Sequence, residues 1–420
     1  MRVLHLNTEE MSGGAARAAN RIHKSLLKQG IESKMLVMHK ESDDHNVCEF
    51  SVGSNKKISK AKKLINARSD FLWMRFAGVS TRKPWSLNRP LFDTNIMEFM
   101  KDVDIINLHW VNSGMLDVRM LKKINKPIVW TMHDMWPFTG GCHYVSDDCR
   151  KFCTSCHDCN QLEGMQKWDI SIKVFRTKRK YYPECIHLVS PSKWLAEEAR
   201  KSALLNMMPI NVIPNCIEIE KFSPKDKLLA RNALGLSKDS KIILFGAMGG
   251  ASDPRKGFQY LKKAMEILYK RKQRVGKKIE LLVFGGDSSD ESFDFPVHYA
   301  GRLHDDISLA LLYSAADVMV VPSHMDNLPN TIMEALSCGT PCVGFNIGGI
   351  PDMIKHGING FLANPYDEED LAESILSVLE NDERQKFMSK KAREYVIKNF
   401  NEKIIAKKYI ELYRQCLINM

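Results

Sequence analysis

The feature that most constrains the fold is an alternation of short β-rich runs with helical patterns along almost the whole chain. Such an alternation predicts βα units, whose strands pair in parallel within a sheet that helices cover on both faces. A chain of 420 residues exceeds the usual ~100 to 200 residues of one domain. Prolines and a break in periodicity at 212–225 indicate a linker. We therefore predict two α/β domains, residues 1–212 and 213–420.

Each domain is expected to contain a doubly wound parallel sheet. The strands expected from their Val-, Ile- and Leu-rich runs are 2–7, 33–38, 104–110, 127–134 and 187–192 in the first domain, and 241–248, 278–286, 297–301, 318–323, 341–346 and 360–365 in the second. From Asp367 onward the pattern is helical, so we expect helices packed at the end of the second domain. Two such sheets facing each other would form a cleft with anion-attracting helix N-termini on both walls.

Composition and charge exclude several classes of protein. Forty-four percent apolar and 26% charged residues are typical of a folded globular chain. The N-terminus begins with a strand-like run rather than an export signal, and the longest apolar runs are shorter than the ~20 residues of a membrane span. We therefore expect a cytoplasmic protein. The net charge of +11 favours anionic partners, among them nucleotide phosphates, anionic membranes and nucleic acid.

Two motifs directly follow expected strands. Gly13 and Gly14 open a helix, where a backbone without side chains can approach a phosphate or a sugar closely, although a simple βα turn explains them equally well. Asp326 precedes a helix that carries Glu334 eight positions later, so both carboxylates are expected in one crevice at the strand ends. Carboxylates there accept hydrogen bonds from sugar and ribose hydroxyls. Solvated acids at a helix start are the alternative.

The segment around these acids resembles the donor-binding motif of family 4 retaining glycosyltransferases, which have the GT-B fold of two Rossmann-like domains facing across a cleft. That motif is a carboxylate, seven residues, a glutamate and then Ala-x-x-x-Gly-x-Pro. Here it reads Asp326, Glu334, Ala335, Gly339 and Pro341. The resemblance implies that Asp326 contacts the donor sugar and that Glu334 binds the ribose hydroxyls.

The start of this motif departs from the family pattern. The first acid is aspartate rather than glutamate, and Asn327, Leu328 and Pro329 replace the usual Gly-Phe-Gly. The resemblance places the backbone of Asn327 and Leu328 near the sugar and the phosphates. Pro329 has no N–H to offer, so one backbone contact of the family has no equivalent here.

A second matching segment contains Arg255 and Lys256, which lead into a helix. In the family a lysine here holds the donor diphosphate, and such a lysine can neutralise the phosphate as it leaves. The family also carries an arginine just after the preceding strand. That arginine is absent, because Gly246 is followed by Ala247 and Met248. Arg255 is the candidate to replace it.

Two further matches involve a histidine and a turn. His133 ends an expected strand, and the resemblance places it beside the sugar, whereas a lone strand-end histidine is otherwise more often structural. His109, at the end of the neighbouring strand, is a weaker candidate. The turn 299–306 resembles the base-binding turn of the family, in which the backbone around Arg302 and Leu303 faces the nucleobase.

Five cysteines fall within residues 142–159. Cys156 and Cys159 have the spacing of zinc-ribbon ligands, with a disulfide or free thiols as the alternatives. Similar cysteine-rich insertions occur in the bacterial exopolysaccharide and colanic-acid type of members that this segment resembles. We predict a structural zinc ion at Cys142, Cys149, Cys156 and Cys159, with Cys153 spare, and no cofactor required for catalysis.

Together these features predict a retaining glycosyltransferase of polysaccharide biosynthesis. Its donor would be a nucleotide diphosphate sugar and its acceptor a glycan or a polyprenyl-diphosphate-linked molecule, with His133, Lys256 and Asp326 as catalytic candidates. The alternatives are an enzyme of the same fold that phosphorolyses glycosidic bonds or epimerises a nucleotide sugar, and a basic zinc-bearing binding module without transferase activity. No nucleic-acid partner is expected, because the acids at 326 and 334 would repel phosphate.

The stretch 56–83 holds nine Lys or Arg residues against one acid, Asp70, with apolar residues at roughly helical spacing. A basic amphipathic pattern suits the surface of an anionic bilayer, and a solvated helix face is the alternative. The resulting hypothesis is a peripheral position at the inner face of the cell membrane.

Overall fold

The structure is a computed structural model that describes residues 1–52, 56–146, 148–165, 167–184, 186–246, 253–286, 293–303 and 305–418. The chain divides into two compact units. The first comprises Met1–Pro214 together with Ile405–Met420, and the second comprises Asn215–Ile404. The change of unit after Pro214 lies close to the expected boundary at residue 212.

The first unit contains a seven-stranded sheet in the order β3-β2-β1-β4-β5-β6-β7, and all its strand pairs are parallel. Its strands are β1 (Arg2–Glu9), β2 (Glu32–His39), β3 (Val47–Glu49), β4 (Ile105–Leu108), β5 (Ile128–Thr131), β6 (Ile186–Ser190) and β7 (Ile210–Val212). The five predicted strands are present. The two edge strands β3 and β7 were not predicted, because three residues give too little periodicity to distinguish a strand from a loop.

Helices and short 3₁₀ turns connect these strands. They are α1 (Gly14–Lys28), α2 (Lys56–Ala67), α3 (Ser69–Ala77), α4 (Ile96–Phe99), η1 (Val118–Lys123), η2 (Trp136–Phe138), η3 (Lys151–Cys153), α5 (Ile170–Tyr181) and α6 (Lys193–Lys201). Polar side chains fix several helix starts. The Asp169 carboxylate accepts from the backbone N–H groups at the start of α5, and Ser192 caps α6 in the same way.

The second unit contains a six-stranded parallel sheet in the order β10-β9-β8-β11-β12-β13. All six predicted strands are present, as β8 (Lys241–Gly246), β9 (Ile279–Phe284), β10 (Val297–Tyr299), β11 (Val318–Val321), β12 (Cys342–Phe345) and β13 (Gly360–Ala363). Alternate residues of β8 belong to different apolar clusters, Ile242 and Leu244 to one and Ile243 and Phe245 to the other. The sheet is therefore buried on both faces, which explains its continuous apolar runs.

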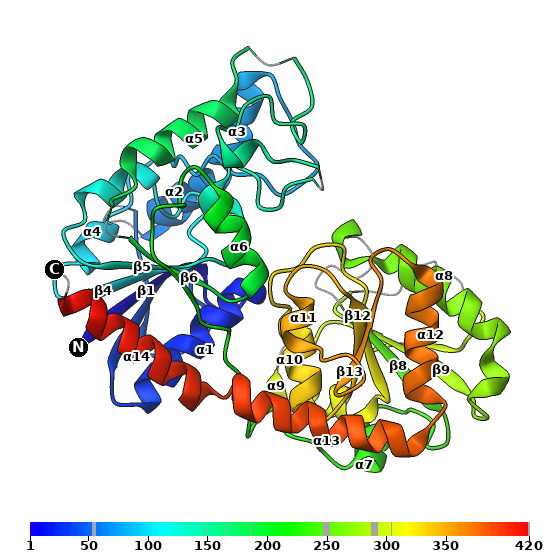
Figure 1. Cartoon of the computed structure of the whole chain (residues 1–420). Helices are drawn as coiled ribbons and strands as arrows, with labels where there is room; N and C mark the ends of the chain where they lie inside the picture. Colours follow the sequence, from blue (N-terminus) through cyan, green and yellow to red (C-terminus); the bar gives the residue numbers. More distant parts are fainter. Residues whose placement is uncertain are drawn as a thin grey trace. The chain divides into compact units, whose positions relative to one another are not determined.

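Helices cover both faces of this second sheet (Figure 1). They are α7 (Lys227–Ala233), η5 (Pro254–Lys256), α8 (Phe258–Lys270), η6 (Lys272–Arg274), α9 (Asp306–Ala315), α10 (Asn330–Ser337), α11 (Ile350–Met353), α12 (Glu368–Leu379) and α13 (Asp382–Asn399). The helices α9 and α10 contribute to one apolar cluster, and α8 and α12 to the other.

The last helix, α14 (Glu402–Ile418), corrects one expectation. We expected the whole stretch from Asp367 to belong to the second domain, but the residues from Ile405 onward belong to the first unit. In Figure 1 α14 lies beside the strand β4. Tyr413 on this helix is fully buried and its hydroxyl accepts a hydrogen bond of 2.6 Å from Asn107 Nδ2. Helical periodicity shows that α14 has a face to bury, but not which domain buries it.

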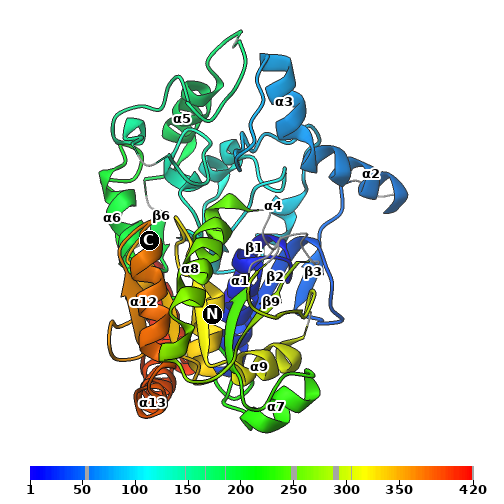
Figure 2. The same cartoon turned by 90° about the vertical axis from the view of Figure 1, so that its right-hand side faces the viewer.

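The basic stretch 56–83 forms two consecutive helices, α2 and α3, which lie above the strands β1 to β3 in Figure 2. The side chains that α2 buries are polar: Ser59, Lys63 and Asn66. Apolar side chains of the two helices are exposed instead, namely Ile58, Leu64, Ile65, Phe71, Leu72 and Phe76. No helix in the described ranges has both the length and the apolar composition to cross a membrane.

Candidate active site

Each sheet has one place where its strand order changes direction, between β1 and β4 in the first unit and between β8 and β11 in the second. In open parallel sheets ligands bind beyond the carboxyl ends of the strands at such a place. Gly13 follows β1, Lys256 follows β8 and Asp326 follows β11. Gly13, Lys256 and Asp326 therefore lie near the strand ends where ligands bind in such sheets.

Lys256 and Asp326 form an ion pair at this position in the second unit. The lysine Nζ lies 2.6 Å from Oδ2 of the aspartate, and the two side chains keep 26% and 12% of their surface exposed. An ammonium group has three N–H donors, so Lys256 can bind a phosphate oxygen while it still holds Asp326. The structure thus brings together two of the three predicted catalytic residues, which are seventy positions apart in the sequence.

Two glycines allow the loops of this ion pair to approach each other. Gly257 has φ +71°, and a Cβ there would lie 1.8 Å from the carbonyl oxygen of Pro322 at the end of β11. Gly348 has φ +60°, and its Cβ would lie 2.4 Å from the carbonyl oxygen of Asp326. Neither position accepts a side chain without displacing the backbone that carries the ion pair.

Arg255 lies in the same 3₁₀ turn as Lys256. Its Nη2 is 2.7 Å from Oδ2 of Asp253, and its carbonyl oxygen accepts a hydrogen bond of 2.8 Å from His324 N. The turn is thereby fixed against the loop after β11. Ala247 and Met248, where the family arginine is missing, lie outside the described residues.

Glu334 is more deeply buried than expected. It lies on α10 with 3% exposure, and its Oε2 accepts a hydrogen bond of 2.8 Å from the Tyr313 hydroxyl. Asn327 and Leu328 precede this helix at 4% and 5% exposure, and Leu328 packs in the apolar cluster. Their contacts with a donor stay predictions.

The predicted base-binding turn lies between β10 and α9. Arg302 is exposed and Leu303 packs partly against the apolar core. The neighbouring Gly301 carbonyl accepts a hydrogen bond of 2.8 Å from Gly285 N, which fixes the turn to the end of β9. A contact with the nucleobase stays a prediction for this turn.

In the first unit, the glycine pair opens α1 as predicted. Gly13 is the N-cap residue with φ +94°, a conformation that favours glycine, and its carbonyl accepts from Arg17 N at 3.0 Å. Its N-cap position has no side chain that could occupy the helix N-terminus. This arrangement is compatible with an anion or a sugar at that end of α1.

His133 is the end of a row of imidazoles. Its Nε2 lies 3.1 Å from Nδ1 of His109, and Nε2 of His109 lies 2.9 Å from Nδ1 of His5. The rings stack at centroid distances of 5.3 and 5.2 Å. The three residues come from the adjacent strands β5, β4 and β1 or from the residues just after them. Sequence reasoning found His133 and, as a weaker candidate, His109, but it missed His5.

Burial keeps this row uncharged. It lowers the pKa of His133 to about 4, and it lowers the pKa of His5 and His109 well below the ordinary histidine value. A neutral imidazole has one donor and one acceptor nitrogen. Successive hydrogen bonds therefore require the three tautomers to point the same way, so the protonated nitrogen of His133 is coupled to those of His109 and His5.

In the cysteine-rich segment Cys142 interacts electrostatically with Cys149, Cys156 and Cys159, the other three predicted ligands. Sγ of Cys142 lies 3.3 Å from Sγ of Cys159, whereas Sγ of Cys156 accepts a hydrogen bond of 3.1 Å from Gly140 N. Among the described residues, no group of three or more His, Cys, Asp or Glu side chains is arranged to hold a metal ion. The zinc ion predicted at Cys142, Cys149, Cys156 and Cys159 stays a prediction, which elemental analysis tests.

Comparisons with known proteins cover both units. A family model described as "Glycosyltransferase Family 4" matches residues 12–221, and one described as "Glycosyl transferases group 1" matches residues 240–381. D-inositol 3-phosphate glycosyltransferase of Saccharomonospora viridis is 29% identical over 214 residues, which are 48% of this chain and 49% of that protein. N-acetyl-alpha-D-glucosaminyl L-malate synthase of Bacillus anthracis is 24% identical over 50% of this chain and 54% of its own. The chain spans about half the length of the curated relatives it matches.

Solved structures share the fold over the full length. Sucrose-phosphate synthase from Thermosynechococcus elongatus matches with a TM-score of 0.71 at 19% identity, and both chains are covered completely. Anabaena Alr3699/HepE in complex with UDP-glucose matches with a TM-score of 0.66 at 14% identity, over 99% of this chain and 100% of that one. The predicted resemblance is confirmed: with two parallel α/β sheets and a family model that covers half of its residues, this chain belongs to glycosyltransferase family 4 and has the GT-B fold.

Proposed function

We propose that the protein is a retaining glycosyltransferase of polysaccharide biosynthesis. It transfers a hexosyl group from a nucleotide diphosphate sugar to a glycan or to a polyprenyl-diphosphate-linked acceptor. The observation that carries this proposal is the ion pair of Lys256 with Asp326, 2.6 Å apart beyond the carboxyl ends of β8 and β11. The Anabaena protein of the same fold, solved with UDP-glucose, supports a nucleotide sugar as donor.

The chemistry follows from the charges at this position. Lys256 binds the donor diphosphate and neutralises it as it leaves, while Asp326 accepts hydrogen bonds from hydroxyls of the donor sugar. The acceptor hydroxyl attacks the anomeric carbon on the face from which the nucleotide diphosphate leaves, and its proton passes to the departing diphosphate, so the configuration is retained. Neutral His133, with its tautomer coupled to that of His109, contributes a hydrogen bond to the sugar.

Substitution of Lys256 tests the proposal directly. In Lys256→Ala we expect donor turnover, measured as UDP, GDP or ADP release from a panel of nucleotide sugars, to fall by about 100-fold or more. Lys263→Ala is the matched control, because Lys263 lies seven residues further along in α8, where its exposed side chain pairs with Glu368 at 2.9 Å. Equal activity of the two folded variants would refute the assignment.

Asp326→Ala separates recognition of the sugar from recognition of the nucleotide. We expect its affinity for the nucleotide sugar to fall more than its affinity for the free nucleotide, because the lost carboxylate faces sugar hydroxyls. Calorimetric titration of both ligands measures the difference. An equal loss for the two would show that Asp326 contacts the nucleotide portion instead.

We also propose that α2 and α3 dock on an anionic membrane. The support is their exposed apolar side chains, with basic residues such as Lys57 and Lys60 exposed beside them. Lys63 belongs to the folded interior, since it is buried and its Nζ lies 2.5 Å from Glu49 Oε1. We expect co-sedimentation with anionic liposomes at low salt, weakened by high salt and by Lys57→Gln with Lys60→Gln. Wild-type protein that stays in the supernatant at low salt would refute membrane docking.

A further inference from the structure

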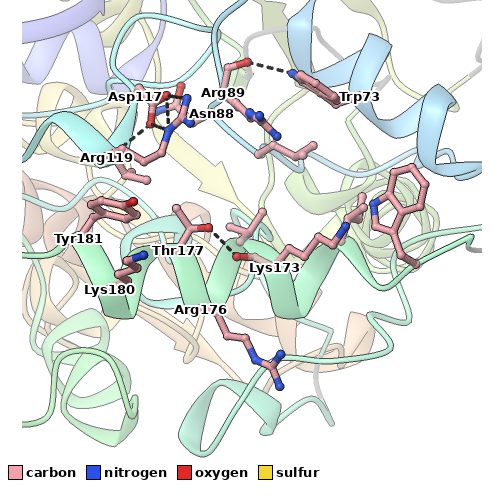
Figure 3. Close-up of a pocket in the computed structure, with 15 residues that line it drawn as sticks. Trp73, Asn88, Arg89, Asp117, Arg119, Lys173, Arg176, Thr177, Lys180 and Tyr181 are labelled. Carbon is pink, nitrogen blue, oxygen red and sulfur yellow. Dashed lines mark hydrogen bonds and ion pairs between the residues drawn. The ribbon is translucent and has the colours of Figure 1, made fainter.

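The first unit has a pocket of about 420 Å³ that contains none of the predicted catalytic or donor-binding residues (Figure 3). Its walls come from α3, the segment 87–89, the start of η1, Trp168 and the length of α5. The volume lies within the range of about 300 to 1,000 Å³ that is usual for small-ligand sites.

Cations dominate these walls. Five basic side chains line the pocket, Arg89, Arg119, Lys173, Arg176 and Lys180. Among its described lining residues Asp117 is the one carboxylate, and it is already occupied by Arg119, whose Nε lies 2.9 and 2.8 Å from its two oxygens. A net positive charge remains.

Aromatic rings hold two of these cations in position without neutralising them. The Arg89 guanidinium lies 4.4 Å from the ring centre of Trp73, and Lys173 Nζ lies 4.4 Å from that of Trp168. Trp73 Nε1 also donates a hydrogen bond of 3.2 Å to the Arg89 carbonyl, which joins the segment 87–89 to α3. Among the described residues no salt bridge pairs either cation with a carboxylate, and cations that are positioned but not paired bind an anion at little ordering cost.

Arg176 is different. It lines the pocket, but in Figure 3 its guanidinium extends from the opposite side of α5, away from Arg89 and Arg119. It therefore adds charge to the same helix without facing the same space, and it serves as a matched control.

We propose that this pocket binds the phosphate or diphosphate group of the glycosyl acceptor. The proposal rests on the transferase function proposed above, since it names where the acceptor's charge is held. The chemistry is the same for a lipid-linked diphosphate and for a soluble phosphorylated saccharide. The exposed Phe71, Leu72 and Phe76 on α3, the helix that contributes Trp73, give the lipid-linked form an apolar surface beside the pocket.

The test is anion binding by the full chain with Lys256→Ala, so that the proposed donor site contributes little. The probes are inorganic diphosphate and farnesyl diphosphate, titrated by calorimetry at low ionic strength. We expect binding of at least one probe, a loss of about tenfold or more in Arg89→Gln with Lys173→Gln, and a change of less than about twofold in Arg176→Gln. Tighter binding of farnesyl diphosphate identifies a lipid-linked group, and equal binding identifies a soluble phosphate.

Two results would overturn the proposal: neither probe binds, or the double variant and Arg176→Gln bind alike. Binding of UDP, GDP and ADP by protein that retains Lys256 is measured separately by calorimetry. It should be unchanged in the double variant, since Arg89 and Lys173 are not among the residues proposed to bind the donor. Loss of donor turnover in the parent protein would overturn the proposed function instead, and the two failures are therefore distinguishable.

Discussion

His23 should make the first unit sensitive to acid. It lies fully buried on α1, its Nδ1 is 2.7 Å from Ser33 Oγ, and its ring centre is 5.8 Å from that of His5. Burial lowers the pKa of His23 from 6.5 to about 4, although Asp44 and Glu10 partly oppose the shift and Lys24 adds to it. The folded chain therefore leaves this imidazole neutral where the unfolded chain protonates it.

The sign and size of this effect on the free energy of unfolding follow from proton linkage. Between about pH 6.5 and pH 4 the unfolded state binds more protons, so the free energy of unfolding falls as the pH is lowered through this window. For one histidine with these two pKa values, acidification from about pH 7 to pH 5 costs about 2 kcal/mol. His23→Asn removes the titrating group while an amide still reaches Ser33. Between about pH 7 and pH 5 the free energy of unfolding of this variant should therefore fall by about 2 kcal/mol less than that of wild type.

Tryptophan fluorescence during urea unfolding, followed at each pH, measures the free energy of unfolding of the first unit alone. All seven tryptophans lie there, at positions 73, 85, 110, 130, 136, 168 and 194. Ser33→Ala is the control, because it removes the hydrogen-bond partner but keeps the titrating ring, and should therefore keep the acid sensitivity of wild type. The same pH dependence for His23→Asn and wild type would refute the reasoning.

Two further substitutions test contacts within the individual units. Gly257→Ala should lower the free energy of unfolding by more than about 1 to 2 kcal/mol and weaken nucleotide binding, because its Cβ would meet the Pro322 carbonyl. Gly276→Ala, also at positive φ but in open space, should lower it by about 1 to 2 kcal/mol and leave nucleotide binding intact. Thermal unfolding with and without UDP compares the two variants. Tyr413→Phe should lower the free energy of unfolding of the first unit by about 1 to 3 kcal/mol, because it removes the hydroxyl that accepts a hydrogen bond from buried Asn107 Nδ2. Tryptophan fluorescence during urea unfolding measures this loss. An unchanged urea midpoint would show that α14 contributes nothing to the stability of the first unit.

The strands could be predicted because their signals are local. A parallel strand buried on both faces needs a continuous apolar run, so β8 and β9 are readable from a few consecutive residues. The need for glycine at 257 could not be predicted in this way, because the Pro322 carbonyl that excludes a side chain there belongs to a distant part of the sequence. The motif residues Lys256 and Asp326 could be named, but their distance could not.

The tertiary structure decided what depends on residues far apart in the chain. Three imidazoles from β1, β4 and β5 form one row only because the strand order makes those strands neighbours. Periodicity in α2 suggested an apolar face, but packing buries Ser59, Lys63 and Asn66 and exposes the apolar side chains. The sequence by itself determines which segments have a face to bury. Which partner covers each face depends on the assembled sheets, because that choice is made by contacts between residues many positions apart.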